Sequence, residues 1–300
     1  METRQATIWK ATLSLLFLLS ACSTPNEIVP TQTTTPPPSP TATATFTPSP
    51  IPPTFTPTPL ACLTQPGGLK QESIPFGNNL QQDFLVYTPP CYNEMTGLHY
   101  PVLYLLHGQT YTQDQWVRLG VPQIADRLIH SGEAPPFIIV FPDDHYWNAE
   151  PGAGFGDRLI QNIIPYIDGT YRTIADRQNR SLGGLSRGGG WTVKLGLEYP
   201  ELFGALGLHS PAVFKDNAPY VERLIKGIPE ESRPQLWLDV GDADSELESI
   251  QLLENVLTRN DYFHEYHFFN GSHSEDYWGD HVEEYLRWYV QAWQEETVIQ

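Results

Sequence analysis

The sequence predicts an α/β fold with a mostly parallel central sheet flanked by helices. Two observations favour this class. Continuous apolar runs, such as Pro101–Leu106 and Phe137–Phe141, suit strands that are buried on both faces. Helical patterns separate these runs, and strands that alternate with helices favour parallel pairing. No internal repeat is visible in the chain.

The expected elements follow one another in a regular order. The expected strands are Asp83–Tyr87, Pro101–Leu106, Phe137–Phe141, Ser181–Leu185, Ala205–His209, Leu236–Val240 and Glu265–Phe269. The expected helices are Gln123–His130, Asp157–Tyr171, Gly190–Tyr199, Pro219–Lys226, Glu246–Asn260 and Asp280–Gln294. The first strand ends at Pro89-Pro90 and the third at Pro142, because proline has no backbone donor for a sheet ladder.

The N-terminal residues 1–21 predict an export signal. The apolar run Ala11–Leu19 is shorter than the roughly 20 residues that span a bilayer, but it has the length of a signal-peptide core. It ends in Leu19-Ser20-Ala21-Cys22, which resembles the bacterial lipoprotein signal. That resemblance implies cleavage before Cys22 and acylation of its thiol. An ordinary secretory peptide with a chance cysteine is the alternative.

Residues 22–60 predict a disordered tether. Of the 37 residues from Thr24 to Leu60, 24 are Pro or Thr, and Glu27 is the single charged one. Repeated Thr-Pro favours extended polyproline II at about 3.1 Å per residue. The folded domain is therefore expected at residues 61–300, which is long enough for one sizeable core.

The charge of the chain excludes two kinds of partner. Lys and Arg number 17 against 35 Asp and Glu, a formal net charge of −18. Nucleic-acid binding draws on a dense basic surface, and an anionic membrane surface would repel this domain. We therefore expect no nucleic-acid partner, and contact with a membrane only through a lipid on Cys22.

The chain has three cysteines. If Cys22 carries the lipid, Cys62 and Cys91 remain as an even pair in an oxidising compartment. A disulfide between them would tie the start of the domain to the end of its first expected strand. Two unpaired, partly buried thiols are the alternative.

A nucleophile is predicted where the fourth expected strand meets the following helix. Gly184-Leu185-Ser186-Arg187-Gly188 is a Gly-x-Ser-x-Gly sequence in a strand–turn–helix context. Such a turn strains the serine backbone, and flanking glycines avoid clashes with the neighbouring chain. It also raises the Ser186 hydroxyl above the helix N-terminus, where amides favour developing negative charge. A plain glycine turn is the alternative.

A base and an acid are expected later in the chain. His273 follows the last expected strand, whereas its rival His281 lies inside the final helical pattern. Asp244 follows the strand Leu236–Val240 and is favoured as the group that orients the imidazole. Asp242 is the runner-up, and a solvated acidic turn that caps the next helix is the bland alternative. Asp143 and Asp144, which also follow a strand, are a third option.

Two backbone amides are expected to bind an oxyanion. One belongs to Arg187, directly after the nucleophile, and the other to Gln109, in the segment Leu106-His107-Gly108-Gln109. Gly108 permits close approach of the chain. His107 is expected to be structural.

With these residues in place, the domain resembles the esterase D-like branch of the α/β-hydrolases, which includes feruloyl and acetyl xylan esterases. The matching segments are Val86–Tyr92, Pro101–Gly108, Trp116, Ile164–Asp168, Tyr171-Arg172, Gly184–Gly189, Gly241–Asp244, His273 and Tyr277-Trp278. The resemblance implies an α/β-hydrolase fold, a Ser186–Asp244–His273 triad and an acyl-enzyme mechanism, with no cofactor or metal. The chain departs from the common pattern at Gln109 and around the histidine, at Ser272 and Ser274-Glu275.

Aromatic side chains are expected to wall the substrate pocket: Trp116, Tyr146, Trp147 and Trp278. Exposed aromatics that merely pack a long loop are the alternative. The sequence thus predicts an extracytoplasmic serine ester hydrolase acting on small-molecule or polysaccharide-linked acyl esters. An acyltransferase with the same triad, and a non-catalytic surface binding module, are the alternatives.

Overall fold

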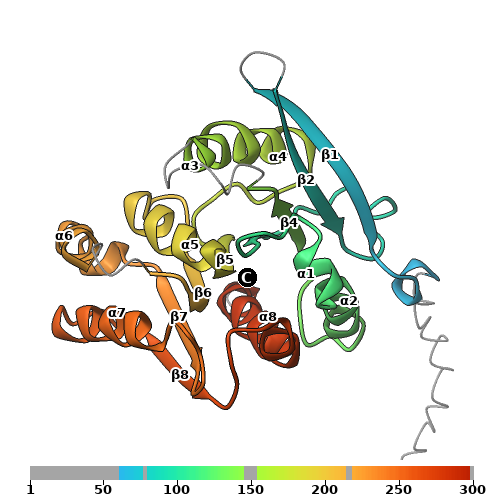
Figure 1. Ribbon diagram of the computed structural model, residues 1–300. Helices are drawn as coiled ribbons and strands as arrows, with labels where there is room; N and C mark the ends of the chain where they lie inside the picture. Colours follow the sequence, from blue (N-terminus) through green and yellow to red (C-terminus); the bar gives the residue numbers. More distant parts are fainter. Residues whose placement is uncertain (1–60, 77–79, 145–153, 214–217, 298–300) are drawn as a thin grey trace, which may run out of the picture. The chain divides into compact units, whose positions relative to one another are not determined.

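An eight-stranded sheet in the order β1-β2-β4-β3-β5-β6-β7-β8 organises the computed structural model (Figure 1). The structure describes residues 61–76, 80–144, 154–213 and 218–297. The expected export signal, the expected tether and Cys22 lie outside these residues and stay predictions. Within the described part of the chain, no helix combines the length and the apolar character needed to cross a membrane.

The strands alternate with helices along the chain. The strands are β1 (Gly68–Phe76), β2 (Leu80–Thr88), β3 (Val102–Leu106), β4 (Ile138–Pro142), β5 (Arg180–Ser186), β6 (Ala205–Pro211), β7 (Gln235–Gly241) and β8 (Glu265–Phe269). The helices are α1 (Gln115–Arg118), α2 (Val121–His130), α3 (Phe155–Arg158), α4 (Ile164–Thr170), α5 (Arg187–Glu198), α6 (Ala218–Gly227), α7 (Leu247–Arg259) and α8 (Glu275–Thr297).

Most of the sheet is parallel. β1 pairs with β2 and β2 with β4 in antiparallel register, whereas β4, β3, β5, β6, β7 and β8 are all mutually parallel. Helices cover both faces (Figure 1). The expectation of an α/β fold with a mostly parallel, helix-flanked sheet is confirmed.

Each face of the sheet has its own core. On one face, α3 to α7 pack on side chains such as Val102 and Tyr104. On the other face, α1, α2 and α8 pack on Leu103 and Leu105. All five residues of β3 are buried. The alternation of its side chains between the two cores explains its continuous apolar sequence.

Three parts of the fold differ from the expected elements. β1 was not expected, because it is an edge strand in which Ile74 alone is buried and no apolar pattern marks it. The final helix begins at Glu275 rather than at Asp280. The helix expected at Asp157–Tyr171 is divided into α3, a π-helical segment at Leu159–Ile163, and α4.

A disulfide joins Cys62 to Cys91, with Cα atoms 5.0 Å apart. Cys62 lies in a short 3₁₀ helix, Ala61–Thr64, and Cys91 follows β2. The bond therefore fastens the first described residues to the sheet.

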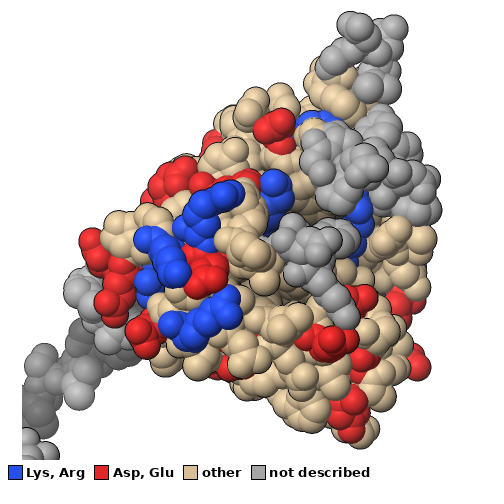
Figure 2. Space-filling model, turned by 60° about the vertical axis from the view of Figure 1, so that its left-hand side comes forward, with Lys and Arg blue, Asp and Glu red and all other residues tan. Residues whose placement is uncertain are grey.

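Basic side chains gather on the surface over α5, α6 and α7, with acidic side chains between them (Figure 2). Lys194 pairs with Glu198 at 3.1 Å. Lys226 and Arg259 both pair with Glu222, each at 2.8 Å. These cations are thus partnered by carboxylates on their own surface.

A buried carboxylate holds α8 to the sheet. Asp239 of β7 is fully buried. Its Oδ1 accepts hydrogen bonds from the Tyr277 and Tyr285 hydroxyls of α8 at 2.8 and 3.1 Å. Its Oδ2 lies 2.8 Å from Nδ1 of His209 and accepts from the Trp237 indole at 2.9 Å. Burial and the Asp239 charge raise the pKa values of Tyr277 and Tyr285 far above the usual range, so both phenols remain donors.

A third tyrosine of α8 completes this network. The buried Tyr289 hydroxyl lies 2.9 Å from Nε2 of His209. A His209 imidazole with its proton on Nδ1 satisfies both Asp239 and Tyr289. The Tyr289 hydroxyl occupies space left by two strand glycines: a Cβ on Gly183 or Gly207 would lie 1.8 or 1.7 Å from it.

We predict that Gly207→Ala lowers the free energy of unfolding by about 2–4 kcal/mol, because the new methyl displaces a packed Tyr289 from His209. Gly169→Ala is the matched control, since a Cβ there meets nothing within 4 Å. That control should be neutral or stabilising by up to about 1 kcal/mol. Denaturant unfolding of both variants measures the difference. Equal stabilities would contradict the assigned packing.

Candidate active site

Ser186 lies at a sharp turn between β5 and α5. Its backbone has a positive φ of 51° with ψ −120°, a conformation that non-glycine residues seldom adopt. The turn is tightly packed, because a Cβ on Gly184 would lie 2.4 Å from the Gly188 carbonyl carbon. A Cβ on Gly188 would lie 2.3 Å from the Leu106 oxygen of β3. Glycine at both positions therefore lets the turn sit against the neighbouring strand.

The structure brings the three expected triad side chains together. Nε2 of His273 lies 2.8 Å from Oγ of Ser186. Nδ1 of the same ring lies 3.0 and 3.2 Å from Oδ1 and Oδ2 of Asp244. The three residues come from the ends of β5 and β7 and from the loop after β8. In space, His273 lies between Ser186 and Asp244. This is the arrangement of a nucleophile, a base and an acid that orients the base.

The surroundings of Asp244 keep it ionised. Burial alone would raise the pKa of its carboxyl group, but hydrogen bonds from His273, Ser210 and the Glu246 amide together lower that pKa below its usual value. The Glu246 amide donates to Oδ1 at 2.7 Å. The carboxylate that faces His273 is therefore charged at neutral pH.

Ser210 is a polar neighbour of this group that the sequence reasoning missed. Its hydroxyl donates to Oδ2 of Asp244 and lies 3.0 Å from Nδ1 of His273. The available signal was its position at the carboxyl end of β6, between the strands that carry Ser186 and Asp244. Ligand-binding groups gather at these strand ends in parallel sheets.

The rival candidates have other partners. Asp242 accepts from the Gly271 amide at 2.9 Å and from the Asn270 side chain at 3.0 Å, so it supports the loop that carries His273. His281 lies in α8, with Nδ1 2.8 Å from Glu284 and its ring stacked on Phe269. Asp244 also takes part of the helix-capping role considered for either aspartate, since it binds the Glu246 amide just before α7.

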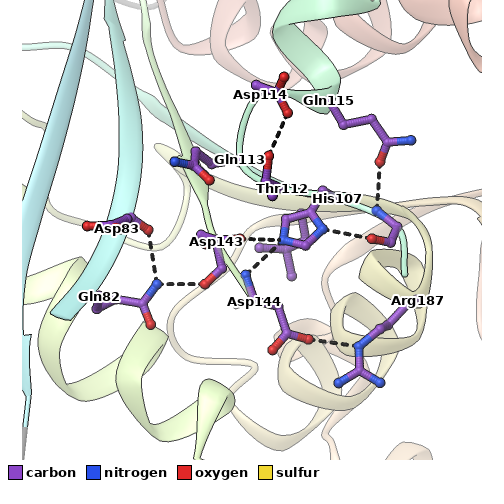
Figure 3. Close-up of polar contacts among 12 residues, drawn as sticks. Gln82, Asp83, His107, Thr112, Gln113, Asp114, Gln115, Asp143, Asp144 and Arg187 are labelled. Atoms are coloured by element: carbon purple, nitrogen blue, oxygen red, sulfur yellow. Dashed lines mark hydrogen bonds and ion pairs between the residues drawn. The ribbon is translucent and has the colours of Figure 1, made fainter. Parts of the chain in front are cut away.

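The loop that carries Gln109 is held from two directions. The Gly108 amide donates to the buried Gln115 side chain at 2.8 Å, and Gln115 in turn donates to Glu275 at 3.2 Å. On the other side, Nδ1 of His107 lies 2.7 Å from the Gly108 oxygen, and the Asp144 amide donates to Nε2 at 2.8 Å (Figure 3). His107 thus ties this loop to the end of β4.

Asp143 and Asp144 are engaged away from the imidazole of His273. Oδ2 of Asp144 accepts from Nε of Arg187 at 2.8 Å (Figure 3) and from the Trp191 indole at 2.9 Å. Asp143 lies 3.2 Å from Nε2 of His107. The Arg187 side chain is therefore turned toward β4, while its amide stays in the first turn of α5, where it has no intrahelical acceptor.

A hollow of about 130 Å³ lies beside the Ser186 hydroxyl. Its lining includes Gln109, Tyr111, His273 and Trp278. The Trp278 ring stands edge-on to His273, with centroids 4.9 Å apart. A second hollow of about 340 Å³ shares Gln109 with the first and includes Arg187 and Ser245.

The prediction that Trp116 lines the substrate pocket is wrong. Trp116 is 1% exposed, and its indole donates to the Leu106 oxygen at 2.9 Å. It packs edge-on to His209 and Tyr285 inside the core. Its large apolar ring is therefore part of the core and not a wall of the pocket. Tyr146 and Trp147 lie outside the described residues.

The sheet and the Ser186–His273–Asp244 arrangement define the α/β-hydrolase class. A family model described as "Putative esterase" matches residues 79–289, more than half of the chain. The chain belongs to this esterase family.

Two curated relatives match parts of the chain. An endo-1,4-beta-xylanase/feruloyl esterase of Xylanibacter ruminicola is 38% identical over 126 residues, which cover 38% of this chain and 17% of that protein. An esterase of Mycobacterium tuberculosis is 34% identical over 125 residues, 38% of this chain and 26% of that protein. The chain thus matches about a quarter or less of the length of these relatives.

Solved structures match more of the domain. A ferulic acid esterase shares 25% identity with a TM-score of 0.68, covering 76% of this chain and 99% of that one. An S-formylglutathione hydrolase from Staphylococcus aureus shares 17% identity with a TM-score of 0.63, covering 75% of this chain and 98% of that one. The second likeness is one of fold alone.

Proposed function

We propose that this protein is a serine hydrolase that cleaves carboxylic esters through an acyl-enzyme intermediate. The observation that carries the proposal is the 2.8 Å distance between Oγ of Ser186 and Nε2 of His273, whose other nitrogen faces Asp244. A serine alcohol becomes a useful nucleophile when a base lies within hydrogen-bond reach, with a third group orienting that base. Membership of the esterase family supports the same reaction class.

Acylation begins when Oγ of Ser186 attacks the ester carbonyl carbon. Nε2 of His273 takes the hydroxyl proton, and the carbonyl π electrons move onto oxygen. The amides of Gln109 and Arg187 donate to this oxyanion. They are preorganised, because one lies in a loop braced by Gln115 and the other in the first turn of α5. Asp244 stabilises the imidazolium that forms.

The tetrahedral intermediate collapses when the imidazolium of His273 gives its proton to the alcohol oxygen. The carbon–oxygen bond to the alcohol breaks, the alcohol leaves, and the acyl group remains on Ser186. Water then attacks the acyl carbon as His273 removes one of its protons. The second collapse returns that proton to Ser186 and releases the carboxylic acid.

The proposed substrates are small-molecule or polysaccharide-linked acyl esters. One curated relative is named a xylanase/feruloyl esterase, and a solved neighbour is named a ferulic acid esterase. Tyr111 and Trp278 line the hollow beside Ser186 and offer aromatic surfaces that suit an aromatic acyl group or a sugar face.

We further propose that the protein is exported and held at the bacterial cell membrane by a lipid on Cys22. The support is the sequence of residues 1–22 and the Cys62–Cys91 disulfide, a bond that persists in oxidising compartments.

Replacing Cys22 tests this location. In a bacterial host, the full wild-type chain should fractionate with membranes and incorporate labelled fatty acid, whereas Cys22→Ala should incorporate no label, because the thiol is the acylation site. Ser23→Ala is the control and should behave as wild type. Fatty-acid labelling of the Cys22→Ala chain at the wild-type level would rule out the anchor.

Ester hydrolysis tests the reaction itself. The full chain should hydrolyse short p-nitrophenyl esters, and Ser186→Ala should lower kcat by about 10⁵-fold, because it removes the nucleophile. Added acceptor alcohol separates two outcomes: a hydrolase releases mainly acid, and a transferase diverts most acyl groups to the alcohol. Equal rates for wild type and Ser186→Ala would end the nucleophile assignment.

A matched pair of substitutions tests the acid. Asp244→Asn should lower kcat by about 10⁴-fold, because an amide cannot stabilise the imidazolium. Asp242→Asn, two residues away, should lower kcat less than about tenfold, because Asp242 only supports the loop. The same p-nitrophenyl assay gives both values. A larger loss for Asp242→Asn than for Asp244→Asn would reverse the assignment.

A further inference from the structure

Ser210 occupies a bulge in β6 directly beside the nucleophile. The register between β5 and β6 pairs Leu185 with His209 and Ser186 with Pro211, so Ser210 is one extra residue. Its φ of 48° is left-handed, a conformation that non-glycine residues seldom adopt. A bulge of this kind re-aims a side chain and often lies next to an active site. Here the extra residue turns its hydroxyl toward the acid.

The hydroxyl of Ser210 contacts both Asp244 and His273, the two residues that the orienting hydrogen bond joins. It is fully buried, donates to Oδ2 of Asp244 and lies 3.0 Å from Nδ1 of His273. The Glu246 amide donates to the other carboxylate oxygen at 2.7 Å. The carboxylate of Asp244 is therefore held at both oxygens, from β6 on one side and from the start of α7 on the other.

The backbone around Ser210 is fixed on both sides. His209 is locked between Asp239 and Tyr289. Two residues after Ser210, the Ala212 amide donates to the Ser186 backbone oxygen at 2.8 Å. Segment 209–212 thus connects the nucleophile turn to the core network, and it carries the Ser210 hydroxyl to Asp244 in between.

We propose that Ser210 is a positioning residue for ester hydrolysis. Its hydroxyl fixes the Asp244 carboxylate against Nδ1 of His273, and its hydrogen bond reduces the negative charge that this carboxylate presents to the imidazole. The inference rests on the proposed function. The Ser210 hydroxyl has one proton, which it donates to Asp244. Its oxygen can therefore only accept a hydrogen bond from the N–H of His273. Ser210 therefore acts through Asp244 and does not touch the reacting atoms.

Other titratable groups lie near the bond between Ser210 and Asp244, on β6, β7 and α8. His209 and Asp239 belong to the core network behind Ser210, and the Tyr277 hydroxyl donates to Asp239. Asp242 lies on the opposite side, bound to the loop of His273. The hydrogen bonds of the Ser210 hydroxyl go to Asp244 and His273 and not to these groups, so we expect a change in pH dependence to report on the bond to Asp244.

Two substitutions separate the hydroxyl from the strained backbone. Ser210→Ala removes the hydroxyl and keeps a Cβ at positive φ, whereas Ser210→Gly removes the hydroxyl and relieves the backbone. Ser181→Ala is the control, a fully buried serine in β5 away from the triad. The full-length variants are compared by kcat, KM, the pH profile of kcat/KM and thermal unfolding.

Both Ser210 variants should lower kcat about tenfold with KM within about twofold, because the carboxylate loses its orientation. The acid limb of the profile should move to higher pH by about half a unit in both, since an unshielded Asp244 favours the protonated imidazole more strongly. Ser181→Ala should match wild type in kinetics.

The result that overturns the inference is unchanged kcat in the glycine variant, or an acid limb that stays in place or moves to lower pH. A kinetic loss in Ser210→Ala alone, with a lower unfolding temperature, would assign the effect to backbone strain and also overturn it. Failure of the proposed function looks different: the wild-type chain itself would not hydrolyse the ester.

Discussion

The positive φ of Ser186 is the backbone constraint on which the arrangement of the site depends. It is compatible with the sheet because Gly184 and Gly188 leave room where a Cβ would collide with the turn or with β3. This close packing brings the ends of three strands together. β3 supplies the loop of Gln109, β5 supplies the serine, and β6 supplies Ser210 through a bulge opposite the turn. The positions of the proposed nucleophile, the proposed oxyanion donors and the support of Asp244 therefore follow from one local geometry.

The buried Asp239 carboxylate performs the corresponding task for His273. It accepts four hydrogen bonds, two of them from Tyr277 and Tyr285 of α8. Because Tyr277 follows His273 by four residues, this network fixes the segment that leaves the imidazole. The loop is also held from the other end, where Asp242 binds Gly271. The position of His273 is thus set by the core on one side and by the end of β7 on the other.

The parts of this structure that follow from local sequence could be predicted, and the parts that depend on distant contacts could not. Apolar runs predict the buried strands, and the glycines on both sides of Ser186 predict its turn. β1 has no such pattern, because solvent covers most of it. Asp239 carries no local signal, and Ser210 carries only its position near the end of β6. The roles of both residues come from partners on other strands, on α8 and in the loop of His273. Trp116 was misplaced for the same reason: its burial is decided by α8 and His209, which lie far away in sequence.

The central claim is that His273 activates Ser186, and covalent labelling tests it most directly. A fluorophosphonate reacts with an activated serine hydroxyl, and peptide mass spectrometry of the labelled full chain locates the adduct. We predict one adduct, on the peptide that contains Ser186, with labelling lost in Ser186→Ala and strongly slowed in His273→Ala. Labelling that persists in Ser186→Ala, or that proceeds at the wild-type rate without His273, would contradict it.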